Sequence, residues 1–176
     1  MKDKELEKDI RAVLKQLDKL PRAIGVTPKG KVVTKEKRTQ SALRASAKKF
    51  ISPIQRNVRD GKEKHYRYRK SDNQKITYYP GNLRKSNKVM KFKKAHPLAI
   101  FVGPKGYRGK STSFGTGNKA DGYYAPFVHD GTENHTPNPF VEKGFNSAKN
   151  EVLKDLKRRV ENIFRYYAKQ KGLGKI

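Results

Sequence analysis

The C-terminal region carries an apolar residue at nearly every helical turn, and no other pattern in the chain constrains the fold as strongly. The residues of this seam follow one another at steps of three or four: Phe145, Ala148, Val152, Leu156, Val160, Ile163 and Tyr167. Such spacing aligns them along one face of a helix. Pro139 precedes the seam, where helix geometry tolerates proline, and Gly172 and Gly174 follow it. The sequence therefore predicts a long C-terminal helix that begins near Pro139.

A shorter seam lies in residues 1–20, which we expect to form an N-terminal helix or arm. Its apolar residues also stand at helical steps: Leu6, Ile10, Val13, Leu17 and Leu20. Pro21 then stops the helix. A lone narrow seam is marginal in water, so this helix must pack on the rest of the chain or on a neighbouring subunit. The remaining residues, 21–176, are expected to form a single domain.

A second helix is predicted from about Lys35 to Val58. Its apolar face comprises five residues: Leu43, Ala47, Phe50, Ile54 and Val58. Pro53 lies inside this range, and we expect it to kink or split the helix.

Strand signals between the helices are short. The ranges 85–92 and 98–102 have the character of two strands, and 31–34 that of a loop or an edge strand. We expect long loops over the polar, basic and aromatic residues 59–82 and over the Gly-rich residues 103–122. Helices at both ends packed on a small antiparallel sheet, with long basic and Gly-rich loops, make an α+β fold.

The chain is lean in apolar residues and strongly basic. Hydrophobic residues make up 34% of its 176 residues, and 43 Lys and Arg against 16 Asp and Glu give a net charge of +27. Residues 21–110 alone carry 26 basic and four acidic side chains, a net of +22. So large a surplus repels itself in a compact monomer unless an anion or an oligomeric surface compensates it.

Composition also excludes several classes of protein. The chain has no Cys, which excludes disulfides, thiolate zinc sites and cysteine nucleophiles. Its longest apolar run is five residues, and the charged N-terminus lacks the apolar core of an export signal. We therefore expect a soluble intracellular or particle-borne protein.

Candidate catalytic and metal-ligating residues are sparse. No GxSxG-type elbow is present, and nothing else in the sequence indicates a nucleophile beside a base. His129, Asp130, Glu133 and His135 could hold a divalent metal, but a turn-rich loop that includes two His is the commoner interpretation. The range 103–106 resembles a phosphate-binding loop without the GxxxxGK[ST] spacing. We expect no catalytic site, no cofactor and no metal.

The stretch from Lys62 to Tyr79 interleaves basic and aromatic residues. Lys and Arg neutralise phosphates, and aromatic rings can stack on unpaired bases. No RNP, zinc-finger or KH signature accompanies this stretch, and a solvated basic loop is the simpler interpretation.

Four segments, in chain order, carry a further pattern. They read Pro80-Gly81-Asn82-Leu83-Arg84-Lys85-Ser86, Val102-Gly103-Pro104-Lys105, Tyr124-Ala125-Pro126-Phe127-Val128-His129-Asp130-Gly131-Thr132 and Pro137-Asn138-Pro139-Phe140-Val141. In this order, and followed by a long helix, they resemble the tail-component family of lambdoid Hong Kong-type phages. These are the head-to-tail neck or tail-completion proteins of long-tailed bacteriophages, and the resemblance covers roughly residues 36–165.

The resemblance implies a virion structural protein that is not an enzyme. It implies a homo-oligomeric ring, hexameric in this family, between the head connector and the tail tube or terminator. Its location would be the neck or tail of the virion, and the host cytoplasm during assembly. It assigns structural roles to the matching residues: Gly81, Leu83, Ser86, Gly103, Pro104, Tyr124, Ala125, Val128, Gly131, Thr132, Pro137, Pro139 and Phe140.

Basic residues of the middle region are candidates for a DNA passage or a protein interface. The candidates are Arg67, Arg69, Lys70, Lys91, Lys93 and Lys94. A ring of positive charge lowers the cost of a polyanion in a channel, and phosphate contacts of this kind carry no sequence information. The competing interpretation is that these residues bind acidic surfaces of neighbouring neck proteins. The alternative function is a stand-alone basic nucleic-acid-binding protein, which the charge of residues 21–110 favours.

Overall fold

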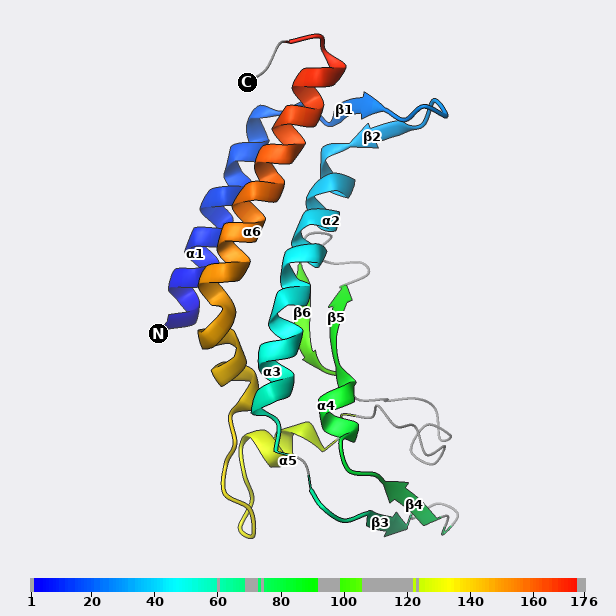
Figure 1. Ribbon diagram of the computed structural model, residues 1–176, viewed down its shortest axis with the longest axis vertical. Coiled ribbons are helices and arrows are strands. Elements are labelled where there is room, and N and C mark those ends of the chain that lie inside the picture. The colour runs from blue at the N-terminus through cyan, green and yellow to red at the C-terminus, as the bar shows by residue number, and fades with distance from the viewer. Residues whose placement is uncertain are drawn as a thin grey trace. The chain divides into compact units, whose positions relative to one another are not determined.

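The computed structural model describes residues 2–59, 61–68, 73, 75–91, 99–105, 122 and 124–173 (Figure 1). They form an α+β fold, as the sequence predicts. The chain separates into two compact units. Unit 1 comprises Met1–Lys49, Lys91–Phe101 and Lys149–Ile176, and unit 2 comprises Phe50–Met90 and Val102–Ala148. The longest helix, α6 (Phe140–Gln170), contributes its first nine residues to unit 2 and the rest to unit 1.

Unit 1 is built on helices. Helix α1 (Lys2–Lys15) continues into a 3-10 turn (Gln16–Lys19), and α1 runs beside the orange part of α6 in Figure 1. Together with α2 (Lys35–Ala47) they bury one apolar cluster: Val13, Leu17, Leu20, Ile24, Ala42, Leu156, Val160 and Ile163. From Ile10 onward the N-terminal seam therefore packs on the chain's own C-terminal helix within unit 1.

A short hairpin connects α1 to α2. Strand β1 (Ala23–Val26) pairs antiparallel with β2 (Val32–Thr34). Of the loop or edge strand expected at 31–34, the structure shows the strand, at Val32–Thr34. Its partner β1 was not predicted, because Gly25 interrupts a run of only four residues. The hairpin is held on α6, since Tyr166 Oη donates to Val26 O (3.2 Å) and Val26 N donates to Gln170 Oε1 (3.3 Å).

The predicted second helix is split, as expected, near Pro53. Helix α2 ends at Ala47, a three-residue 3-10 turn follows (Lys48–Phe50), and α3 (Ile51–Asn57) begins directly after it. Pro53 therefore lies in the first turn of α3, where a backbone N–H would have no partner within the helix. The break lies before the proline, not at it.

Unit 2 contains a hairpin that the sequence did not predict. Strands β3 (His65–Tyr68) and β4 (Lys75–Tyr78) pair antiparallel, with Tyr66 opposite Thr77 and Tyr68 opposite Lys75. The prediction of an unbroken loop over 59–82 is therefore wrong for the described residues. Every second residue of β3 is aromatic, but the basic residues between them hide the alternation of a strand.

Two strands follow this region, as expected, but with shifted bounds, since Lys85 and Ser86 of the expected range 85–92 end a short helix and the second strand extends to Pro104. The two strands are β5 (Asn87–Lys91) and β6 (Ile100–Pro104), which pair with each other. The short helix α4 (Asn82–Ser86) precedes β5, and α5 (Ala125–His129) precedes α6. The expected connection at 95–97 and most of the expected Gly-rich loop, residues 106–121, lie outside the described residues.

Helix α6 begins at Phe140 and ends at Gln170, as the sequence predicts, and Gly172 follows it with φ +66°. In the part of the chain that the structure describes, no helix combines the length and the apolar character needed to cross a membrane.

Candidate functional site

The four segments that carry the family resemblance all lie in unit 2, where hydrogen bonds join them. Gly81 lies at the N-terminus of α4 in a left-handed conformation (φ +80°), which glycine adopts readily. Because it is a glycine, it has no side chain that could cap the helix. The Leu83 N–H, in the first turn of α4, donates to Tyr124 Oη (3.1 Å), the residue that precedes α5. A tyrosine from the third segment thus caps the helix of the first.

The second segment continues this network. Ser86 is fully buried, and its hydroxyl donates to Leu83 O (2.7 Å) while its carbonyl accepts from Lys105 N (3.0 Å). Lys105 O accepts in turn from Gly122 N (3.0 Å), and Gly122 O from Ala125 N (2.9 Å). Gly103 and Pro104 are the last two residues of strand β6, and Lys105 follows them directly.

Gly122 was not among the predicted site residues, although the network needs it. A Cβ at this position would lie 2.6 Å from Ser86 Oγ and 2.8 Å from Pro104 Cβ. Only a glycine lets the chain pass this closely between two other segments. Because Gly122 ends a Gly-rich stretch that the sequence indicates to be a loop, no local pattern distinguishes it from the other glycines.

The fourth segment ties to the third at the start of α6. Asn138 N donates to Val128 O (3.0 Å), and its side-chain Nδ2 donates to Asn57 O (3.0 Å). Phe140 is fully buried with the His129 ring edge-on to it at 5.6 Å. Asn138 was also missed by sequence reasoning, which considered only the two prolines that flank it.

The turn between α5 and α6 depends on Gly131. It has φ +83°, and an added Cβ would meet His135 O at 2.8 Å and Pro137 Cγ at 2.8 Å. Thr132 and His135 exchange two backbone hydrogen bonds within this turn. We call the thirteen predicted motif residues, together with Gly122 and Asn138, the motif cluster. Its members act through backbone geometry, capping and packing.

The acid and imidazole groups near the motif cluster do not converge. His129 Nδ1 pairs with Asp130 Oδ1 at 2.7 Å, and His135 joins Thr132 through its backbone. No three His, Cys, Asp or Glu side chains of the described residues gather closely enough to hold a metal ion.

A second candidate surface lies on the β3–β4 hairpin of unit 2. Tyr66, Tyr68, Lys75 and Thr77 share one face of the hairpin, because directly opposed and alternate residues of paired strands point the same way. We call these four residues the hairpin face. Tyr66 is 56% and Tyr68 57% exposed.

The predicted channel or interface residues are only partly within the structure. Arg67 takes its place in β3 and Lys91 in β5. The other four lie outside the described residues: Arg69, Lys70, Lys93 and Lys94.

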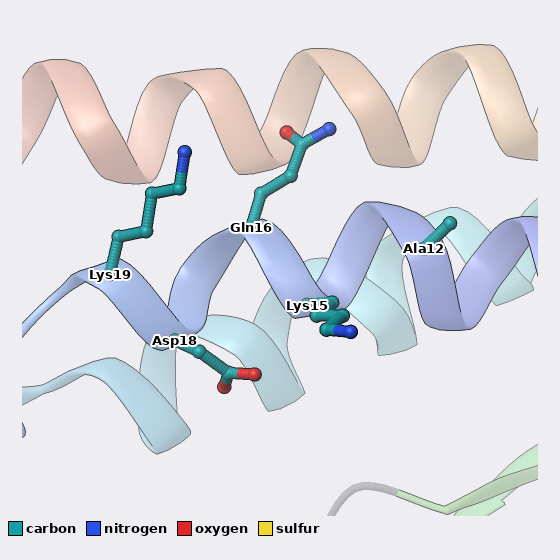
Figure 2. Close-up of a pocket in the computed structure, with 5 residues that line it drawn as sticks. All are labelled: Ala12, Lys15, Gln16, Asp18 and Lys19. Atoms are coloured by element: carbon teal, nitrogen blue, oxygen red, sulfur yellow. The ribbon is translucent and has the colours of Figure 1, made fainter.

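A surface hollow of about 520 Å³ lies on the N-terminal helical segment of unit 1 (Figure 2). Its lining consists of Ala12, Lys15, Gln16, Asp18 and Lys19. In Figure 2 the Gln16 and Lys19 side chains point to one side and Asp18 to the other. The hollow therefore offers no convergent set of polar groups for a ligand.

Comparisons of the chain with known protein families, with curated proteins and with solved structures found no match.

Proposed function

We propose that this protein is a structural component of the bacteriophage neck, which completes the tail or joins head to tail as a ring. One observation carries the proposal. The four segments that resemble the neck family are separate in sequence, yet backbone and capping hydrogen bonds join them into the motif cluster. Residues that share a structural role are expected to match a family pattern together, whereas chance matches would be scattered.

The chemistry of the motif cluster supports a role in assembly, not in catalysis. Its polar groups bond to one another, as Leu83 N–H does to Tyr124, Ser86 Oγ to Leu83 O and Asn138 N to Val128 O. A nucleophile needs a free base and an orienting group beside it, and the motif cluster presents no such arrangement. The role we propose is structural and involves neither catalysis nor a cofactor.

Exposed apolar side chains support the formation of a homo-oligomer. They include Val26 and Val32 on the β1–β2 hairpin, Phe101 on β6 and Phe127 on α5. Subunits of a closed ring bury different surfaces of each copy against the next, so apolar residues on several elements suit that arrangement. The proposed neighbours are the head connector and the tail tube or terminator. The proposed location is the virion neck, and the host cytoplasm during assembly.

Two measurements on the native protein test the proposal. Mass spectrometry of purified virions should detect the chain at a copy number that fits one ring per particle. Native mass spectrometry of the purified protein should show a closed oligomer at high concentration. Absence from purified virions, together with a strictly monomeric protein at high concentration, would contradict the proposal.

The second candidate function is a stand-alone nucleic-acid-binding protein. The observation that favours it is the net charge of +22 in residues 21–110. A direct binder of duplex DNA should lose affinity with salt at a slope near −0.9 for each neutralised phosphate. Saturable binding with a steep slope by a protein that is absent from virions would favour this candidate, and weak binding that does not saturate would favour the neck role.

A further inference from the structure

The hairpin face combines exposed aromatic rings with positive charge. Tyr66 and Tyr68 are two residues apart on β3, and each leaves more than half of its surface open to solvent. Lys75 stands opposite Tyr68 on β4, and its Nζ lies 3.9 Å from the centroid of the Tyr66 ring. The Lys75 ammonium therefore lies against the Tyr66 ring, on the face of the hairpin that also carries Tyr68.

Further cations flank this face. Lys64 Nζ lies 5.3 Å from the centroid of the Tyr79 ring, and Lys62 is exposed just before β3. Glu63, also exposed, is the acidic residue among them. Three lysines against one glutamate leave the described part of the hairpin positively charged, which makes it complementary to phosphate.

From this arrangement we infer that the hairpin face binds single-stranded nucleic acid. Unpaired bases stack on Tyr66 and Tyr68, and the backbone phosphates lie against Lys75 and Lys64. Lys75 is the register partner of Tyr68, and its Nζ lies against the Tyr66 ring, so a phosphate between bases stacked on the two rings lies near this ammonium. The binding is sequence-tolerant, because every base has a face that can stack. This inference goes beyond the neck role and does not depend on it.

A single strand fits this surface better than the two other polyanions that a basic hairpin could meet. Duplex DNA keeps its bases stacked on one another, so only its phosphates would be used and the two rings would be idle. An acidic protein surface would likewise pair with the lysines and leave the rings without a matching partner. Exposed rings beside ammonium groups match the two parts of an unpaired nucleotide.

The test uses the full-length protein and a fluorescent oligothymidylate of about 16 nucleotides, a length suited to binders of this kind. Anisotropy titrations over a salt series measure affinity for the single strand and for a duplex of the same length. The test variant is Tyr66→Ala with Tyr68→Ala. The matched variant, Tyr66→Phe with Tyr68→Phe, keeps both rings. Phe127→Ala controls for the loss of an exposed aromatic residue elsewhere in unit 2.

The inference predicts that the alanine double variant loses about 5- to 150-fold in single-strand affinity per ring. The phenylalanine double variant and Phe127→Ala should stay within about twofold of the wild type, because the hairpin rings are intact. Duplex affinity should fall little in the alanine variant. Exposed positions are chosen so that the fold is kept, and far-ultraviolet circular dichroism checks this.

Three results would overturn the inference. The first is a wild type that does not bind the single strand at low salt. The second is an alanine double variant that binds it as tightly as the wild type does, in which case binding through charge alone still stands as the second candidate function. The third is polyglutamate binding that depends on the two rings while oligonucleotide binding does not. None of these results bears on the neck role.

Discussion

Asp155 shows how one buried charge can hold two helices of unit 1 together. It is 6% exposed, and it accepts hydrogen bonds from Ser46 on α2 (2.9 Å) and from Arg158 and Arg159 on α6 (2.7 and 2.6 Å). Burial alone would raise the pKa of this carboxyl group. The hydrogen bonds from Arg159, Arg158 and Ser46 outweigh burial and lower the pKa from 3.8 to about 2.

The lowered pKa of Asp155 predicts a loss of stability in acid. Its contribution is complete above the unfolded pKa and is lost as pH falls through the folded pKa, between about pH 4 and about pH 2. The shift corresponds to roughly 2 kcal/mol of unfolding free energy at neutral pH. Asp155→Asn should therefore unfold more easily than the wild type at pH 7, and the difference should shrink toward pH 2.

Urea unfolding at a series of pH values measures this effect. Glu151→Gln is the matched control, because Glu151 pairs with Lys49 (2.6 Å) on the exposed surface, where ion pairs contribute little. A gap between Asp155→Asn and the wild type that stays constant from pH 7 to pH 2 would contradict the account of this carboxylate.

Gly144 allows α6 to approach α3 within unit 2. A Cβ at this position would lie 2.6 Å from Ile54 Cα, N and Cγ1, and the backbone atoms cannot move aside locally. Gly144→Ala should gain about 1 kcal/mol in helix propensity. Forced overpacking costs about 1–3 kcal/mol and more when backbone must shift, so we expect a net loss of stability.

The matched control for this substitution is Asn146→Ala, at an exposed position on the same helix. It should raise the free energy of unfolding by about 0.5 kcal/mol, because alanine is the better helix former and nothing crowds it. Chemical denaturation compares the two variants. If Gly144→Ala were as stable as Asn146→Ala, the space between Gly144 and Ile54 would accommodate a methyl group, and the account of this contact would be wrong.

Helix α4 depends on a cap that a distant residue provides. The buried Leu83 donates its N–H to Tyr124 Oη, and Gly81 before the helix cannot supply a side-chain cap. Tyr124→Phe should leave that donor unsatisfied at a cost of about 1–3 kcal/mol. The amide of Leu83 should then exchange with deuterium faster, which hydrogen-exchange mass spectrometry measures.

Tyr166→Phe is the control for the loss of a tyrosine hydroxyl. The Tyr166 hydroxyl donates to Val26 O on the exposed β1–β2 hairpin, where water can replace it. We expect a change within about 0.5 kcal/mol, at the low end for a hydrogen bond. Equal losses in the two variants would mean that burial of the Leu83 amide does not decide the effect.

Periodic elements were predictable from the sequence, and contacts between distant segments were not. The seams of α1 and α6, the split near Pro53 and strands β5 and β6 follow from spacing and breakers. The β3–β4 hairpin was missed because basic residues mask its alternation. The Ser46–Asp155 bond joins residues 109 positions apart, and no local pattern indicates it. Of the motif cluster, the resemblance named the turn and core residues but not Gly122, whose role depends on neighbours from other segments.

The whole chain has a net charge of +27, and a surplus of this size destabilises a compact monomer by self-repulsion. The proposed neck ring would place much of it either around a passage for DNA or against acidic neighbouring proteins. Charge reversal of Arg67, Arg69 and Lys70 to Glu separates these two outcomes. Particles that assemble but eject or retain DNA abnormally support the passage, and failure of head-to-tail joining supports the interface. Unchanged assembly and DNA delivery would mean that these three residues do neither.

Cryo-electron microscopy of the intact particle tests the central claim most directly. The proposed function predicts a closed ring of this chain at the junction of head and tail, with the 31-residue helix α6 recognisable in each subunit. The density should also show the buried members of the motif cluster, such as Ser86 and Phe140, inside each subunit, while exposed apolar residues such as Phe127 meet a neighbour. Particles whose neck is fully accounted for by other chains would contradict the claim.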